Sequence, residues 1–371
     1  MKVVYCIPGI YAAGGTERVV INKANYLSSK GYDVIIITTD QDNRDVFFKL
    51  DKRVKHFDLK INYYKNSTRS LLIKLYYFFC NRILHRIRLR ELLLYLKADV
   101  VISIFMNEMS ILPYINDGSK KILEFHFSRP FFKINRKPGL IGVIHSIQER
   151  LDISIIKKYV KFVVLTEEDK LNWQELSNMS VISNASSIEG EGAVHDGDVI
   201  AVGRLTAQKG FNRLIDVWSR VGVERTLKIY GAGELHEDLE KQIKALHLDK
   251  KVFLEEPTSN MQKVYSGSSL LVMTSFYEGL PMVMLEAQSF GLPIVSFDFP
   301  CGPKDVIDDG KDGYIIRDGD VSAMAEKITE LLQNDDMRVS MGINAKNKSV
   351  RYKQDKIMQQ WCDLFDEITN A

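Results

Sequence analysis

The sequence predicts an α/β protein in which two doubly wound parallel sheets, one in each half of the chain, face a cleft. Its 371 residues exceed the usual size of one domain, so two domains are expected. Short apolar runs rich in β-branched residues alternate with longer helical patterns, which is typical of βαβ units. Loops rich in glycine and charge follow several of these runs, where the ligands of parallel sheets bind.

The strands expected in the first half are Val3–Ile7, Val34–Thr38, Val100–Ile104, Ile122–Phe125 and Phe162–Leu165. Those expected in the second half are Val199–Val202, Thr226–Tyr230, Val252–Leu254, Leu270–Thr274 and Pro293–Phe297. The segment 183–198 between them is small, polar and glycine-rich, as expected for a domain boundary. Helical patterns at 321–332, 336–349 and 355–369 complete the chain.

The formal net charge of +2 conceals a split between the halves. Residues 1–180 contain 29 Lys and Arg against 18 Asp and Glu, whereas residues 181–371 contain 21 against 30. From residue 60 to residue 97 there are nine basic residues and a single acid, Glu91. This asymmetry indicates that the first half meets an anionic surface, either a nucleic acid or a membrane.

The four cysteines, Cys6, Cys80, Cys301 and Cys362, show no spacing typical of a metal site and are expected to be buried, reduced thiols. The apolar start of the chain is too short for a signal peptide and is expected to form a strand. No run of about 18 apolar residues predicts a transmembrane helix.

The first glycine-rich loop runs from Gly9 to Glu17, between a strand and a helix. It lacks the lysine of a phosphate-binding P-loop, because Gly15 stands at that position. Gly14 and Gly15 permit close backbone approach, and amides at the helix start suit an anionic group. A merely tight turn is the alternative.

The second loop follows the first strand of the second half and contains Gly203, Arg204 and Lys209. Two cations five residues apart on one loop can converge on one polyanion. A diphosphate is the candidate, since Arg binds it bidentately and Lys adds a point charge. The alternative is a solvated loop with two ordinary basic residues.

The third loop contains Glu278, and Glu286 lies in the apolar helix that follows. A carboxylate at the position of Glu286 needs a partner, and two ribose hydroxyls could provide it. The amides of residues 279–282 at the helix start could bind a phosphate or sugar hydroxyls. Alternatively, a neighbouring Lys or Arg satisfies Glu286.

Together VGRLTAQKGF, YGAGELHEDLE and FYEGLPMVMLEAQSFGLPIVSFD resemble the retaining, nucleotide-sugar-dependent glycosyltransferases of family 4, which have the GT-B fold. GGTERVV matches the family's first loop, and EFHFSRPFFK and SFDFPCGPKDVI resemble bacterial enzymes of capsule, lipopolysaccharide and exopolysaccharide assembly. The resemblance implies two Rossmann-like domains, an acceptor-binding domain at 1–185 and a donor-binding domain at 186–354. It also implies a C-terminal helix, about 355–371, that crosses back to the first domain.

The resemblance also implies roles for individual residues. Arg204 and Lys209 would hold the donor diphosphate, Glu286 the ribose, and Glu278 would face the transferred sugar. Gly279, Leu280 and Pro281 would present backbone to sugar and phosphate, and Gly14 and Gly15 would approach the phosphates from the other domain. His126 would contact the donor sugar near the reacting centre, and Arg129 would line the acceptor side. The roles counted as catalytic are those of His126, Glu278, Arg204 and Lys209.

Residues 61–97 combine basic side chains with aromatic residues and leucines, including Tyr76, Arg82, Arg86, Arg88 and Arg90. This composition favours a helix that lies on an anionic membrane surface. A solvated pair of basic helices is one alternative. Nucleic acid is the other, and we expect no nucleic-acid partner because no recognised binding module accompanies the segment.

The sequence therefore predicts a retaining transferase that moves a hexose or N-acetylhexosamine from a UDP-sugar to a lipid-linked saccharide in cell-surface polysaccharide synthesis. We expect it to be cytoplasmic and peripheral on the inner face of the cell membrane. No cofactor and no metal are expected, because Arg204, Lys209 and helix amides can compensate the leaving group's charge. A nucleotide-sugar 2-epimerase and a non-catalytic nucleotide-sugar-binding protein are the alternatives.

Overall fold

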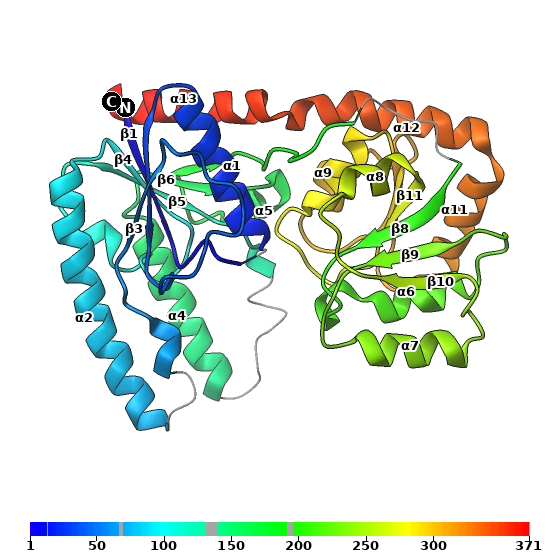
Figure 1. Ribbon diagram of the computed structural model, residues 1–371, viewed down its shortest axis with the longest axis horizontal. Helices are drawn as coiled ribbons and strands as arrows, with labels where there is room; N and C mark the ends of the chain where they lie inside the picture. Colours follow the sequence, from blue (N-terminus) through cyan, green and yellow to red (C-terminus); the bar gives the residue numbers. More distant parts are fainter. Residues whose placement is uncertain (13, 67–69, 131–139, 191–195, 371) are drawn as a thin grey trace.

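The computed structural model describes all residues of the chain except 13, 67–69, 131–139, 191–195 and 371. Two separate parallel sheets are present, one in each half of the chain, and helices cover both faces of each sheet (Figure 1). The expected α/β class with two doubly wound domains is therefore confirmed.

The first sheet has seven strands in the order β3-β2-β1-β4-β5-β6-β7. Their bounds are β1 Lys2–Ile7, β2 Asp33–Thr38, β3 Lys55–Asp58, β4 Val100–Ser103, β5 Lys120–Glu124, β6 Lys161–Val164 and β7 Met179–Val181. All pairings are parallel, and the central strands are buried on both faces, which explains their continuous β-branched runs.

Two layers of helices cover the first sheet. One face packs against α1 (Gly15–Ser29) and α13 (Gln354–Asn370), and the other against α2 (Leu71–Leu96) and α4 (Leu140–Ile156). The smaller helices of this half are η1 Tyr63–Asn66, η2 Leu112–Tyr114 and α5 Glu167–Leu171. None of the described helices is long and apolar enough to cross a membrane.

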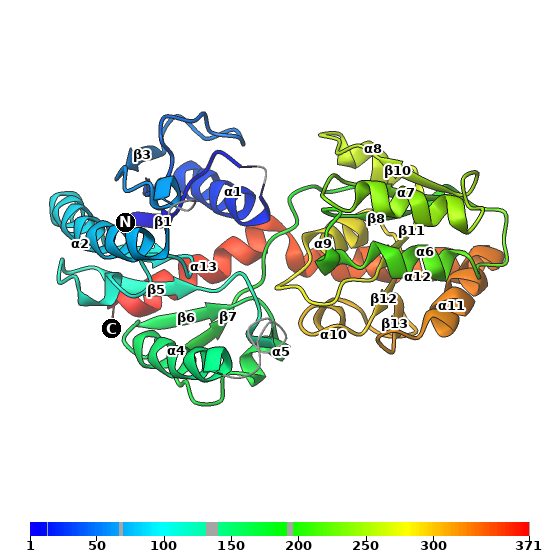
Figure 2. The same ribbon diagram turned by 90° about the horizontal axis from the view of Figure 1, so that it is seen from below.

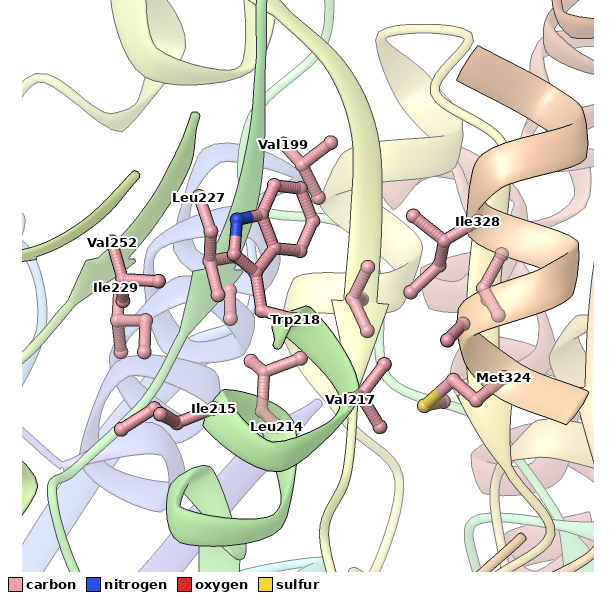
Figure 3. Close-up of a cluster of buried hydrophobic side chains, with 14 of the residues drawn as sticks. Val199, Leu214, Ile215, Val217, Trp218, Leu227, Ile229, Val252, Met324 and Ile328 are labelled. Atoms are coloured by element: carbon pink, nitrogen blue, oxygen red, sulfur yellow. The ribbon is translucent and has the colours of Figure 1, made fainter. Parts of the chain in front are cut away.

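The second sheet has six strands in the order β10-β9-β8-β11-β12-β13. Their bounds are β8 Asp198–Val202, β9 Leu227–Tyr230, β10 Val252–Glu255, β11 Ser268–Met273, β12 Ile294–Phe297 and β13 Gly313–Ile316. On one face, Trp218 and its neighbours on α6 (Phe211–Trp218) fill the core together with Met324 and Ile328 of α11 (Val321–Gln333), as Figure 3 shows. The other helices here are η3 Ala207–Lys209, α7 His236–Ala245, α8 Met261–Ser266, α9 Met282–Ser289, α10 Pro303–Val306, α12 Asp335–Ser349 and η4 Val350–Tyr352.

The last helix joins the two halves. From the end of α12 the chain passes through η4, and α13 then runs back across the first sheet (Figures 1 and 2). Trp361 and Phe365 of α13 are fully buried in the core beneath β1 and β4. The expected crossover helix is confirmed.

Three strands were not expected from the sequence, namely β3, β7 and β13. All three lie at the edge of a sheet, where a strand pairs on one side only and needs fewer apolar residues. The sequence of β3, KHFD, is mostly polar, and β7 has only three residues. The expectation that every cysteine is buried is also wrong, because Cys80 on α2 is exposed.

Candidate functional site

The candidate site lies where loops from the carboxyl ends of the two sheets meet. The loop after β5 contains His126, and the loop between β11 and α9 contains Glu278 and Gly279. A Cβ on Gly279 would lie 2.2 Å from the carbonyl oxygen of His126, so only glycine permits this approach of the two backbones. The sequence-predicted residues of the two domains are thus brought together.

Lys209 and Glu278 form an ion pair in this site. Nζ of Lys209 lies 2.6 Å from Oε1 of Glu278, and the hydroxyl of Ser275 donates to the same oxygen at 2.8 Å. Both charged side chains are about nine-tenths buried, with 15% and 11% of their surface exposed. The pair places a cation and a carboxylate side by side at the end of the second sheet.

The loop that carries Lys209 is tightly packed. A Cβ on Gly203 would lie 2.8 Å from Cε of Lys209, so this glycine makes room for the lysine side chain. Arg204 lies on the same loop, but its side chain is exposed, whereas Lys209 is largely enclosed. The two predicted cations therefore share a loop, and Glu278 contacts Lys209.

A buried arginine that the sequence reasoning missed fixes the loop after β11. Arg213 on α6 donates to the carbonyl oxygens of Thr274 and Ser275, each at 2.7 Å, and pairs with Asp318 at 2.7 Å. Its guanidinium also stacks on Phe276, 3.9 Å from the ring centre. These contacts hold the backbone just before Glu278 in place. The sequence could have indicated that Arg213 is buried, because this residue lies two positions into an amphipathic helix whose buried face is otherwise apolar.

Glu286 is 2% exposed, and its carboxylate has partners from both domains. Arg18 of α1 lies 2.8 Å from Oε1, Ser187 of the inter-domain segment donates to the same oxygen, and the hydroxyl of Tyr265 donates to Oε2 at 2.9 Å. Burial, followed by the charge of Glu286, raises the pKa of Tyr265 well above its ordinary value. The alternative of a helix acid paired with an arginine thus describes this structure, and the ribose role of Glu286 stays a prediction.

The predicted amide site lies at the start of α9. Pro281 precedes its first turn in an extended conformation, and Leu280 beside it is buried. The first amides of a helix have no partner within the helix and carry its positive dipole end. Gly279, Leu280 and Pro281 therefore lie where backbone could face an anionic or hydroxyl-rich ligand.

The first glycine-rich loop faces the same region from the other domain. Gly15 begins α1, and a Cβ placed there would meet no atom within 4 Å. Gly14 precedes it in an extended conformation. Arg18, one turn along the same helix, reaches Glu286 across the domain boundary. The structure thus shows open space beside Gly15 at the start of α1.

His126 belongs to a buried charged cluster. Its Nε2 lies 3.2 Å from Oε1 of Glu124, the last residue of β5, and Lys23 of α1 donates to the same oxygen. The sequence reasoning missed Lys23 and Glu124. Lys23 lies four residues from both Val19 and Leu27, so helical periodicity could have placed it on the buried face.

Arg129 has partners within the first domain. Its guanidinium contacts Glu149 at 3.0 Å and Glu175 at 2.5 Å, and it lies 4.6 Å from the ring centre of Trp173. These interactions connect the loop after β5 to α4 and to the segment after α5. Its predicted role on the acceptor side stays a prediction.

The predicted surface residues of α2 fall into two groups. Arg82 donates to Ser110, and Arg88 donates to the carbonyl oxygen of Leu59 at 2.6 Å, so these two anchor the helix. Arg86, Arg90 and Tyr76 are exposed, Tyr76 with 65% of its surface. Large apolar side chains exposed on the same helix are Ile73, Leu75, Phe78, Phe79, Ile83, Ile87 and Leu94, and α4 exposes Ile147 and Leu151.

The chemistry of this arrangement is electrostatic. Lys209 is paired with Glu278, an exposed arginine lies on the same loop as Lys209, and the start of α9 follows Glu278, which suits a polyanion attached to a polar group. Within the described residues, no group of three or more His, Cys, Asp or Glu side chains is arranged to hold a metal ion. The absence of a cofactor and of a metal stays a prediction.

The chain is similar to a family of proteins, to individual proteins of known sequence and to solved structures. The model of the family described as glycosyl transferases group 1 matches residues 189–348. An uncharacterized glycosyltransferase of Haemophilus influenzae is 31% identical over 97% of this chain and 98% of its own. A Campylobacter jejuni protein, named GalNAc-alpha-(1->4)-GalNAc-alpha-(1->3)-diNAcBac-PP-undecaprenol alpha-1,4-N-acetyl-D-galactosaminyltransferase, is 27% identical over the full length of both chains. A crystal structure of a mutant of S. aureus TarM in complex with Fondaparinux, alpha-GlcNAc-glycerol and UDP superposes with a TM-score of 0.77, at 18% identity, over 98% of this chain and 99% of that one.

Proposed function

The chain belongs to the group 1 glycosyl transferases, and on that premise we propose that it transfers a hexose or N-acetylhexosamine from a UDP-sugar to a lipid-linked saccharide with retention of configuration. Its class, glycosyltransferase, follows from the family. The donor, the acceptor and the stereochemistry are the proposal. The observation that carries it is the meeting of His126, Lys209 and Glu278 between the two sheets.

The donor part of the proposal rests on the second domain. Lys209 lies at the carboxyl end of the second sheet, and the start of α9 lies in the loop next to it. Arg204 is exposed on the same loop as Lys209. These groups would neutralise the charge that develops on a departing UDP diphosphate. The UDP in the complex of the structurally similar TarM supports the choice of nucleotide.

In the proposed reaction the bond between the anomeric carbon and the phosphate oxygen breaks, and its electron pair leaves with UDP. The acceptor oxygen forms its bond to the same face of the anomeric carbon, and its proton passes to the departing phosphate. Lys209 stabilises the leaving diphosphate in this step. Glu278 faces the sugar and is held by Lys209 and Ser275.

The acceptor part of the proposal rests on the surface of the first domain. The exposed aromatic and apolar residues of α2 surround Arg86 and Arg90, a composition that suits the interface of an anionic membrane. The name of the Campylobacter relative includes an undecaprenol-linked saccharide, a lipid-linked acceptor of the proposed class. We therefore place the protein at the inner face of the cell membrane, with residues 61–97 against the lipid.

Nucleotide sugars test the donor assignment. UDP-glucose, UDP-galactose, UDP-GlcNAc and UDP-GalNAc are compared with GDP-mannose for thermal stabilisation and for hydrolysis, since a ligand that binds the native state raises Tm. We expect at least one UDP-sugar to raise Tm more than GDP-mannose and to be hydrolysed. Equal shifts with all five, together with no hydrolysis, would reject the donor assignment.

Vesicle sedimentation tests the membrane assignment. Wild type should sediment with anionic vesicles and much less with neutral ones, and the double variant Arg86→Glu, Arg90→Glu should lose this binding. The matched control exchanges Lys250 and Lys251, which lie next to each other in the second domain, for glutamate. Equal binding of wild type and the α2 variant to anionic vesicles would contradict the assignment.

A further inference from the structure

Three ionisable side chains from two elements and a loop meet beneath the site. Lys23 of α1 donates to Oε1 of Glu124, and Nε2 of His126 lies 3.2 Å from that oxygen. The exposed fractions of the three side chains are 4%, 0% and 4%. The ammonium of Lys23 also lies 4.2 Å from the ring centre of Trp361, on the crossover helix.

Such a cluster is an expensive way to stabilise a core. The desolvation free energy of a buried lysine and glutamate commonly exceeds the free energy of their mutual attraction. A protein with apolar residues of similar volume in their place is often as stable. Burial lowers the pKa of Lys23. Burial would raise the pKa of Glu124, but the charge of Lys23 and the contact with His126 outweigh it and lower that pKa to about 2. Glu124 is therefore an ionised acceptor at neutral pH.

His126 connects this cluster to the cleft. Its backbone carbonyl is where Gly279 of the other domain makes its close approach, one residue from Glu278. Nε2 of His126 lies within ion-pair distance of Oε1 of Glu124, without the alignment of a hydrogen bond. The negative charge of the carboxylate favours a proton on this nearer nitrogen, so that in a ring with one proton the other nitrogen is an acceptor.

We propose that Glu124 and Lys23 are positioning residues for His126. Glu124 holds the ring with Nε2 protonated, so that Nδ1 accepts a hydrogen bond from a hydroxyl of the transferred sugar. Lys23 keeps the Glu124 carboxylate ionised and in place. This inference rests on the proposed function, because it assigns a task to the histidine of that site.

The matched control is another buried carboxylate of the same sheet. Glu108 is 1% exposed, lies just after β4 and accepts a hydrogen bond from Ser103 at 2.7 Å. Glu108→Gln therefore replaces a buried carboxyl group of the first domain without removing a partner of His126. An effect shared by Glu124→Gln and Glu108→Gln would be structural.

The first readout needs no substrate. Long-range ¹H–¹⁵N spectra of protein labelled at its seven histidines report the tautomer of each ring, and His126→Gln identifies the signals of His126. We expect Nε2 protonation in wild type and in Glu108→Gln, and a mixture of tautomers in Glu124→Gln. An unchanged tautomer in Glu124→Gln would overturn the proposal.

The second readout is a double-mutant cycle on UDP-sugar hydrolysis. Glu124→Gln should lower kcat about 10-fold to 100-fold, because misplacement of a contacting group by about 1 Å has effects of this size. In a His126→Ala background, the same substitution should have no further effect on kcat. Equal losses in both backgrounds would show that Glu124 does not act through His126.

The two readouts separate this inference from the proposed function. If His126→Ala retains wild-type kcat while Glu124→Gln still changes the tautomer, the task assigned to His126 fails and its positioning by Glu124 stands. Lys23→Met is a second variant and should change tautomer and kcat in the same direction as Glu124→Gln. A Lys23→Met protein with wild-type spectra and kcat would remove Lys23 from the proposal.

Discussion

Replacing Lys209 by methionine removes the cation of the proposed diphosphate site and keeps an unbranched side chain of similar length. In the structure this cation lies 2.6 Å from Glu278, and Cε fits against Gly203. Methionine can occupy the same narrow space. The substitution therefore tests the charge of Lys209 with little change in packing.

Two effects of different size follow. Loss of one preorganised group that stabilises developing negative charge costs about 10²-fold to 10³-fold in kcat. Glu278 keeps its hydrogen bond from Ser275, so the loss in unfolding free energy should be about 1 kcal/mol. For domains of this size that corresponds to a fall in Tm of about 2–4 °C.

The double variant Lys209→Met, Glu278→Gln separates the two effects. In Lys209→Met alone, the largely buried carboxylate of Glu278 has lost its cation, whereas the double variant has no carboxylate at this position. Tm of the double variant should therefore return toward wild type. UDP release from the best UDP-sugar should stay low. Lys241→Met, at a position paired with Asp238 on the exposed surface of α7, is the control and should change neither quantity. A Lys209→Met enzyme with kcat within about twofold of wild type would refute the reasoning.

Two further predictions concern the contact between the domains and the stability of the first domain. Gly279→Ala places a methyl group 2.2 Å from the carbonyl oxygen of His126, so we expect the two domains to separate. X-ray scattering should show a larger radius of gyration, and kcat should fall. An unchanged radius of gyration would contradict this prediction. Burial raises the pKa of Glu108 to about 7 from 4.5, so the unfolding free energy should fall as pH rises between these values, where the unfolded chain ionises this group and the native state does not. Urea unfolding should show a smaller fall in Glu108→Gln, and equal pH profiles of the two proteins would be evidence against the raised pKa.

Much of the architecture could be predicted because the buried strands are continuous apolar runs. All ten expected strands are present, although their ends differ by one or two residues. The edge strands β3, β7 and β13 were not predicted, since their pairing depends on neighbours distant in sequence. β3 is mostly polar and β7 has only three residues, whereas β13, GYII, contains strand-forming residues but is only four residues long. The last helix was predicted from the sequence pattern, whereas its return to the first domain followed from the resemblance alone.

The residues of the site were predicted separately for each loop. The contacts between residues of different loops were not predicted. Lys209 and Glu278 were each identified from sequence, but their ion pair requires the loops after β8 and β11 to be neighbours. Arg18 and Tyr265 are separated from Glu286 by 268 and 21 residues, and only the folded chain brings them to its carboxylate. Spacing within one loop cannot reveal such partners.

The stereochemistry of UDP-sugar hydrolysis tests the central claim most directly. A ¹H NMR time course with each of the four UDP-α-sugars identifies the first anomer of the free sugar before it equilibrates in water. Retaining transfer from a UDP-sugar predicts that the α-anomer appears first with at least one donor, and faster than with Lys209→Met. Initial release of the β-anomer, or no hydrolysis above the Lys209→Met rate with any of the four, would contradict it.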